Sequence, residues 1–280
     1  MEHVISKPDQ TSSCPFTLRY RGGDHAPPAQ WNEVLDTLLS HRSVRAYLPH
    51  PVRPKTLELL IAAAQSAATS SNLQTWSVVA ITDQDRKNRL AELAGNQNHI
   101  RQAPLFLVWL ADLARISAMA RERDVTLEGV HYLEVLMVGI VDAALAAQNA
   151  VIALESLGLG SVYIGGIRNH PEKVAAELGL PPMTFPVFGL CVGTPDPTQP
   201  AHVKPRLPQA AVLHHEQYGA DGQPGAIAEY DKRLQIFQTE ENLPPEGWAE
   251  RSLNRVRTAK SLAGRDRMRE ALANLGFELR

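Results

Sequence analysis

The sequence predicts an α+β sandwich, in which helices cover a sheet of short buried strands. Apolar residues recur at helical spacing in several long segments. Isolated runs rich in β-branched and aromatic residues lie between these segments and end at Gly, Pro or Asp. This alternation of helices with single strands favours a sandwich over an all-helical bundle.

The helices are predicted from apolar periodicity and capping residues. The longest is rich in Ala and Leu and ends at Gly158 and Gly160. Glu134, Asp142 and Glu155 interrupt its apolar residues too often for a membrane span, so we expect a buried helix. The predicted helices cover residues 31–39, 54–68, 84–93, 130–157, 171–178, 226–238 and 253–275.

The strands are predicted from short apolar runs. The first, WSVVAIT, is closed by Asp83, and the last stops at Gly193. Because buried strands alternate with helices along the chain, we expect helices to flank the sheet. The predicted strands cover residues 76–82, 104–110, 161–164 and 186–192.

Composition narrows the class of protein. The 280 residues are 44% hydrophobic and carry a net charge of −2, which provides a full core but no basic field for nucleic acid. Cys14 and Cys191 are the two cysteines, so no disulfide framework is expected. Residues 1–30 lack the apolar block of a signal peptide and are predicted to be a flexible extension. We therefore expect a cytoplasmic protein without membrane or nucleic-acid partners.

Two basic segments suggest an anion site. His41–Arg45 (HRSVR) places two guanidiniums and a hydroxyl close together, and Lys204 and Arg206 flank a stiffening proline. Arg offers paired donors that match a phosphate. The alternative for each segment is solvated surface charge.

Polar loops and a glycine pair could form the rest of a pocket. Residues 67–76 (AATSSNLQTW) and 95–99 (GNQNH) could contact a heterocycle, or could be ordinary capping loops. Gly165 and Gly166 follow a strand and could admit a flat ligand close to the backbone, or form a simple turn. The order of strand and helix around them is the reverse of a dinucleotide fingerprint. No metal site or serine-hydrolase motif is predicted.

Taken jointly, the segments resemble the oxygen-insensitive NAD(P)H nitroreductase family, in the branch that holds the major nitroreductase and the NADPH-flavin oxidoreductases. The resemblance runs from about Val34 to Phe237. The matching segments are HRSVRAYLPHPV, SSNLQTWSVVAITD, GNQNHIRQAP, VDAALAAQNAVIALESLGLGSVYIGGIRN, FPVFGLCVGTP and VKPRLPQAAVLHHEQY.

The resemblance implies a homodimer with a central antiparallel or mixed sheet and FMN at the subunit interface. Residues 31–213 would form the FMN-binding core, and residues 214–280 a helical tail that wraps the core or the partner subunit. The Gly165 N–H would face the flavin N5, and Arg168 would contact the nicotinamide nucleotide or an anionic substrate. The cofactor contacts would be His41, Arg42, Ser43, Arg45, Thr69, Ser70, Ser71, Gln74, Gln97, Tyr163, Ile164, Gly165, Gly166, Lys204 and Arg206.

The implied activity is hydride transfer from NADPH or NADH to FMN, followed by two-electron reduction of a nitroaromatic, a quinone or free flavin in ping-pong turnover. A flavin reductase that supplies reduced FMN and a non-catalytic flavin-storage protein are the alternatives. A purely structural dimer would leave both arginine clusters unexplained. Residues 240–248 read EENLPPEGW where the branch usually carries arginines, so the preferred donor stays open, with Arg251, Arg255 and Arg257 as substitutes.

Overall fold

The computed structural model describes residues 14–21 and 29–280, which divide into two compact units. The sheet unit comprises residues 43–201 and 263–280, and the helical unit comprises the described part of residues 1–42 together with 202–262. This division differs from the expected boundary after residue 213, because the end of the chain belongs to the sheet unit.

The sheet unit is built on four strands, β1 (Trp76–Ile81), β2 (Leu105–Asp112), β3 (Gly160–Ile164) and β4 (Thr184–Gly193). Their order is β1-β2-β4-β3, and every neighbouring pair is antiparallel. The four predicted strands are therefore confirmed within a few residues, and the sheet is antiparallel. A shift of register between Trp109 and Leu110 marks a bulge in the central pair.

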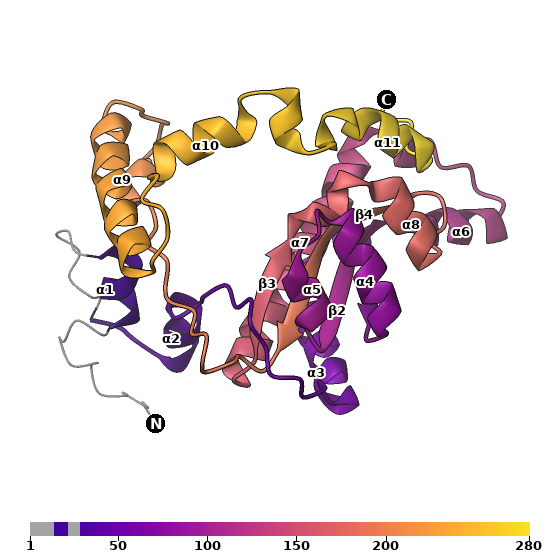
Figure 1. Ribbon diagram of the computed structural model, residues 1–280. Helices are drawn as coiled ribbons and strands as arrows, with labels where there is room; N and C mark the ends of the chain where they lie inside the picture. The colour runs from indigo at the N-terminus through magenta and orange to yellow at the C-terminus, as the bar shows by residue number, and fades with distance from the viewer. Residues whose placement is uncertain (1–13, 22–28) are drawn as a thin grey trace. The chain divides into compact units, whose positions relative to one another are not determined.

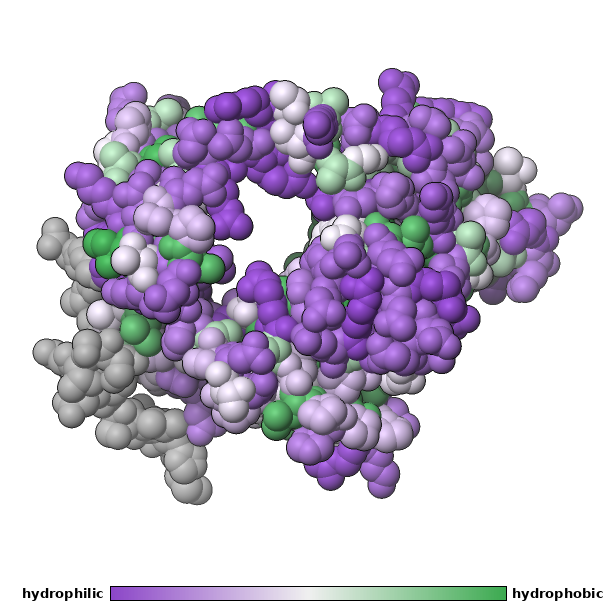
Figure 2. Space-filling view, viewed as in Figure 1, coloured by the Kyte–Doolittle hydropathy of each residue, from purple (hydrophilic) through white to green (hydrophobic). Residues whose placement is uncertain are grey.

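Helices cover both faces of this sheet (Figure 1). Along β2, Leu105, Leu107 and Trp109 pack with α3 (Pro54–Gln65) and α7 (Leu133–Ser156). The alternate residues Phe106, Val108 and Leu110 pack against the other layer of helices. That layer consists of α4 (Gln84–Leu93), α5 (Asn98–Gln102) and α8 (Pro171–Leu178), and Figure 2 shows its outer surface over α4 and α5 as hydrophilic. The predicted sandwich is confirmed.

Helix α7 is long and apolar enough to cross a membrane by length and composition, yet one side of it packs on the sheet. A Cβ atom at Gly139 would lie 3.1 Å from the Ala111 Cβ, which shows how closely the helix approaches β2. Its opposite side exposes Met137, Val141 and Leu145. The helix therefore carries a core face and a second, uncovered apolar face.

The predicted helix over residues 253–275 is wrong. The chain forms α10 (Trp248–Val256) and α11 (Met268–Asn274), separated by two short 3-10 turns. Ala263 and Gly264 between them have φ values of 53° and 86°, so the apolar spacing continues but the backbone leaves the helix. Helix α11 packs its Leu272 beside Phe185 of the sheet unit.

The helical unit has a small core of Tyr230, Leu234 and Phe237 on α9 (Gln223–Glu240), joined by Trp248 of α10. Helix α2 (Glu33–Leu39) is capped at its N-terminus by Asn32, whose side chain accepts a hydrogen bond from the Leu35 N–H. Within residues 1–30, which were expected to be flexible, the structure describes helix α1 (Pro15–Tyr20), in which Arg19 is buried. The rest of the expected extension, residues 1–13 and 22–28, lies outside the described residues. The remaining helical elements are α1 (Pro15–Tyr20), α6 (Ala114–Glu122), η1 (Ser70–Asn72), η2 (Gly129–His131), η3 (Gly165–Asn169), η4 (Gln209–Ala211), η5 (Ala259–Leu262) and η6 (Arg265–Arg267).

Candidate functional site

In the helical unit, one buried guanidinium joins the two basic segments. Arg19, 7% exposed, donates to the carbonyl oxygens of Leu39 at 2.8 Å, His41 at 2.7 Å and Lys204 at 2.9 Å. The Arg206 N–H returns a bond to the Arg19 carbonyl at 2.9 Å. Two segments are therefore held close through their backbones. One carries His41 and Arg42, and the other carries Lys204 and Arg206. No motif in the sequence marks Arg19 for this position.

The other half of the first basic cluster belongs to the sheet unit. Ser43 pairs with Ser161 in an isolated parallel bridge, and the Val44 N–H donates to the Ser161 carbonyl at 2.8 Å. A Cβ at Gly160 would lie 2.6 Å from a Val44 methyl, so a glycine at the start of β3 allows this close approach. Arg45 is exposed. The unit boundary thus falls inside the cluster, between Arg42 and Ser43.

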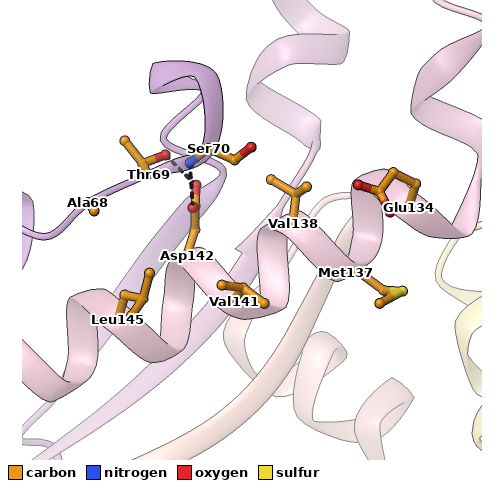
Figure 3. Close-up of a pocket in the computed structure, with 9 residues that line it drawn as sticks. All are labelled: Ala68, Thr69, Ser70, Glu134, Met137, Val138, Val141, Asp142 and Leu145. Atoms are coloured by element: carbon orange, nitrogen blue, oxygen red, sulfur yellow. Dashed lines mark hydrogen bonds between the residues drawn. The ribbon is translucent and has the colours of Figure 1, made fainter. Parts of the chain in front are cut away.

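The loop before β1 is held by a buried carboxylate. Asp142 of α7, 1% exposed, accepts bonds from the Thr69 hydroxyl at 2.6 Å and from the Thr75 hydroxyl and N–H at 3.0 Å each. It also accepts from the Ser70 N–H at 3.3 Å, and Figure 3 shows it reaching Thr69 and Ser70 from α7. In the sequence, Asp142 looked only like an interruption of an apolar helix.

These bonds support a backbone that the local sequence does not favour. Ser71, Asn72 and Gln74 have φ values of 49°, 54° and 51°, in the left-handed region. The Thr69 hydroxyl also accepts from the Gln74 N–H at 2.9 Å, so its hydrogen bonds shape the loop itself. Ser70, Ser71 and Gln74 are exposed. Asp142 therefore positions the polar loop that the sequence assigned to the flavin.

At the opposite edge of the sheet, the Gly165–Gly166 turn meets Gln97. The Gln97 side chain donates to the Ala94 carbonyl at 2.8 Å. A Cβ at Gly166 would lie 2.3 Å from that carbonyl oxygen and 2.6 Å from the Gln97 Nε2 atom. Only glycine fits there, and the predicted contacts Gln97, Gly165 and Gly166 lie together as expected.

Two guanidiniums lie beside this turn. A Cβ at Gly165 would be 3.4 Å from the Arg168 Nη2 and 3.7 Å from the Arg265 Nη1. Arg168 donates to the Val187 carbonyl, and the Arg265 Nε donates to the Asn169 side chain at 2.8 Å. Arg168 lies beside the turn, and its contact with the nicotinamide nucleotide or an anionic substrate stays a prediction. Arg265 was missed because it lies in the segment expected to be a continuous helix.

The strand end contributes backbone more than side chains. Ile164 is 1% exposed, so its side chain belongs to the core and its backbone alone can face a ligand. Tyr163 is 37% exposed, and its ring packs edge-on against Phe188 with centroids 5.1 Å apart. Burial raises the pKa of Tyr163, which keeps the phenol neutral.

Arg45 lies close enough to His99 for its charge to matter. Burial, and then the Arg45 charge, lower the pKa of His99, so this ring is neutral at pH 7. The Arg45 charge therefore acts on the 95–99 loop within the sheet unit.

Two sets of predicted flavin contacts, the 69–75 loop and the Gly165 turn, lie apart within one sheet unit. The 69–75 loop leads into β1, whereas Gly165 follows β3, and these are the two edge strands. Three strand spacings correspond to roughly 14 Å. Beside the loop, the uncovered face of α7 borders a groove of about 430 Å³ (Figure 3). It is lined by Ala68, Thr69, Ser70, Glu134, Met137, Val138, Val141, Asp142 and Leu145.

The chain is similar to proteins of one known family. A family model described as "Nitroreductase family" matches residues 38–194, and one described as "Nitroreductase family, C-terminal domain" matches residues 204–280. An "FMN reductase (NADPH)" of Bacillus subtilis is 38% identical over 228 residues, covering 80% of this chain and 91% of that protein. An "Oxygen-insensitive NADPH nitroreductase" of Salmonella typhimurium is 42% identical over 201 residues, covering 72% and 80%. Among solved structures, the chain is similar to an NADPH:FMN oxidoreductase from Vibrio harveyi complexed with NAD+. The sequences are 34% identical, the TM-score is 0.78, and the match covers 89% of this chain and 100% of that one.

Proposed function

Because the chain belongs to the nitroreductase family, we propose that it is an NAD(P)H-dependent oxidoreductase that holds FMN and reduces nitroaromatics, quinones or free flavin by ping-pong turnover. The observation that carries the proposal is the turn of Gly165 and Gly166, with Gln97 packed against it and two guanidiniums beside it. A flat, anionic cofactor suits both features. Since reduced nicotinamide nucleotides are found inside cells, we place the enzyme in the cytoplasm.

The residues present fit FMN. At the buried Gly166 a side chain would overlap the Ala94 carbonyl and Gln97, so glycine lets the turn pack there, and the half-buried Gly165 is the position that a planar ring can approach. His41, Arg42, Lys204 and Arg206 supply positive charge for the phosphate, held close in backbone by Arg19. When bound, the flavin supplies the redox chemistry, accepting a hydride from the nicotinamide nucleotide and passing two electrons to the acceptor.

The remaining roles belong to the protein groups around the ring. The Gly165 N–H donates toward the flavin N5, and Ser43 and Arg45 contact the ribityl chain and the pyrimidine edge. Arg168 orients the anionic part of the nicotinamide nucleotide or acceptor. Together these groups bind and orient both partners of the transfer.

A second copy of the chain completes the site in this proposal. The 69–75 loop and the Gly165 turn lie at opposite edges of one sheet, and the face of α7 next to the loop is apolar and exposed. Covering that face with a partner subunit would bury Met137 and Val141 and would bring the partner's loop to the flavin. Homodimerisation thus explains both the uncovered face and the separated contacts.

Replacing Met137 with Asp tests the dimer. A carboxylate at the centre of a buried apolar interface is costly to desolvate, so we expect monomers by multi-angle light scattering and loss of bound flavin. Met119→Asp, which places the same charge at an exposed position on α6 outside this groove, should leave the dimer intact. A fully dimeric Met137→Asp protein that retains FMN would contradict the placement of the interface.

The activity is tested by the absorbance spectrum of the purified protein before and after anaerobic addition of NADPH or NADH. We expect a flavin band that bleaches and returns on adding a nitroaromatic or a quinone. A protein that binds FMN but is bleached by neither donor would be a storage protein. A protein that takes up no FMN would contradict the proposed function altogether.

A further inference from the structure

Helix α1 is an addition to the family's common part of the chain. The two family matches begin at residue 38 and end at residue 280, and α1 covers Pro15–Tyr20. Yet this helix makes hydrogen bonds to both basic segments of the helical unit. A segment outside the matched residues is therefore built into the candidate phosphate site.

The arrangement at Arg19 joins two cationic segments through their backbones. His41, Arg42, Lys204 and Arg206 carry like charges or can do so, and like charges held together repel one another. The Arg19 guanidinium donates to the carbonyl oxygens of Leu39, His41 and Lys204. The partial negative charges of three backbone carbonyls thus hold the two segments together around one guanidinium.

Helix α1 is itself fastened to the helical unit at several points. The Arg233 side chain donates to the Tyr20 carbonyl at 3.1 Å, and the Gln209 side chain donates to the Tyr20 hydroxyl at 3.3 Å. Arg21 pairs with Glu240 and lies 4.7 Å from the centre of the Phe237 ring. Cys14, just before the helix, is 3% exposed. These contacts make α1 a docked element that holds Arg19 in place.

We propose that α1 is a clasp that preorganises the phosphate end of the flavin site, with Arg19 as its positioning residue; this rests on the proposed function. By holding the basic segments close before the ligand arrives, the clasp lowers the ordering cost of binding a phosphate. The benefit falls on the phosphate alone. Arg19 therefore sets the preference for FMN over riboflavin, which has the same ring system and lacks the phosphate.

The test measures dissociation constants for FMN and for riboflavin, by flavin fluorescence, on full-length apoprotein. For Arg19→Gln we expect FMN affinity to fall about tenfold, since three carbonyls lose a charged donor, and riboflavin affinity to change less than twofold. Arg19→Lys keeps the charge but has no planar fork, so its FMN loss should be smaller. Lys232→Gln, which removes an exposed cation from α9 of the same unit, is the control for loss of charge and should keep the wild-type ratio of the two affinities.

The outcomes separate this inference from the proposed function. Wild-type protein that binds no FMN contradicts the function itself. Wild-type protein that prefers FMN, with the same preference in Arg19→Gln, overturns the clasp alone. Equal losses for both flavins show a merely structural role and also overturn it. If Arg19→Gln does not fold, Arg19→Lys decides by the same criterion: a loss confined to FMN supports the clasp, and no loss or an equal loss of both flavins rejects it.

Discussion

The sheet unit and the helical unit build their parts of the candidate site in different ways. In the sheet unit, the Gly165–Gly166 turn and the polar loop are attached to strands and to α7, and a buried Asp142 fixes the loop with four hydrogen bonds. In the helical unit, a single guanidinium from α1 joins the two basic segments. In our proposal, recognition of the ring depends on elements packed in the core of the sheet unit, whereas recognition of the phosphate depends on α1, which lies outside the residues matched by the family models.

This contrast has a physical basis. A flat ring needs close backbone approach, which packing and glycine provide, and a change there disturbs the core. A phosphate needs positive charge at the right distance, which exposed side chains on preorganised backbone provide. We therefore expect changes in the sheet unit to affect stability and flavin binding together, and changes in the helical unit to affect binding alone.

The largest effect is expected for Asp142→Asn. The amide nitrogen cannot accept hydrogen bonds, so at least one of the buried groups of Thr69, Ser70 or Thr75 is left without an acceptor. The free energy of unfolding should fall by about 2–3 kcal/mol, measured by urea denaturation. Flavin affinity should fall as well, because the left-handed loop loses its support. Asp221→Asn, at an exposed position outside the sheet unit, is the control and should change neither quantity.

Asp142 also shows what could and could not be predicted from the sequence. The strands, α3, α4 and α8 follow from local patterns of apolar residues and caps, and the structure has them within a few residues. Asp142, by contrast, binds groups 67 to 73 positions away, and Arg19 reaches the Lys204 carbonyl 185 positions away. Such pairings depend on tertiary structure and leave no periodic signal.

The failed prediction at the end of the chain has the same cause. Ala259, Leu262 and Ala263 keep a helical spacing, but the positive φ of Ala263 and Gly264 ends the helical path. A Cβ at Gly264 would lie 2.8 Å from the Asn169 carbonyl oxygen, so the turn packs against η3 next to the candidate site. The same turn places Arg265 beside Gly165. Because a continuous helix was expected over residues 253–275, both the break in the helix and this arginine were missed.

Gly166→Ala should have the next largest effect and tests whether ring binding depends on the core. The new methyl would overlap the Ala94 carbonyl, which is backbone and cannot simply rotate away. We expect a loss of about 1–3 kcal/mol in the free energy of unfolding and at least a tenfold loss of affinity for FMN and riboflavin alike. Gly129→Ala, where a Cβ meets open space, serves as the control. A Gly166→Ala protein with wild-type flavin affinity would break the contrast between the two units.

Arg265→Gln should have the smallest effect and would sharpen the contrast by locating a second anion contact in the sheet unit. Arg265 lies beside Arg168 at the Gly165 turn, so losing its charge should raise the KM for the nicotinamide nucleotide about fivefold with little change in kcat. Flavin affinity should stay unchanged, because the phosphate of FMN belongs to the helical unit in our proposal.

The control is Arg267→Gln, two positions further on. Arg267 pairs with Glu172 and holds the pKa of that carboxyl at about 2, so it supports the packing of η6 on α8 and takes no part in ligand binding. Equal KM values for wild type and Arg265→Gln would assign nucleotide recognition to Arg168 alone, and a parallel loss of FMN affinity would make Arg265 a flavin contact as well.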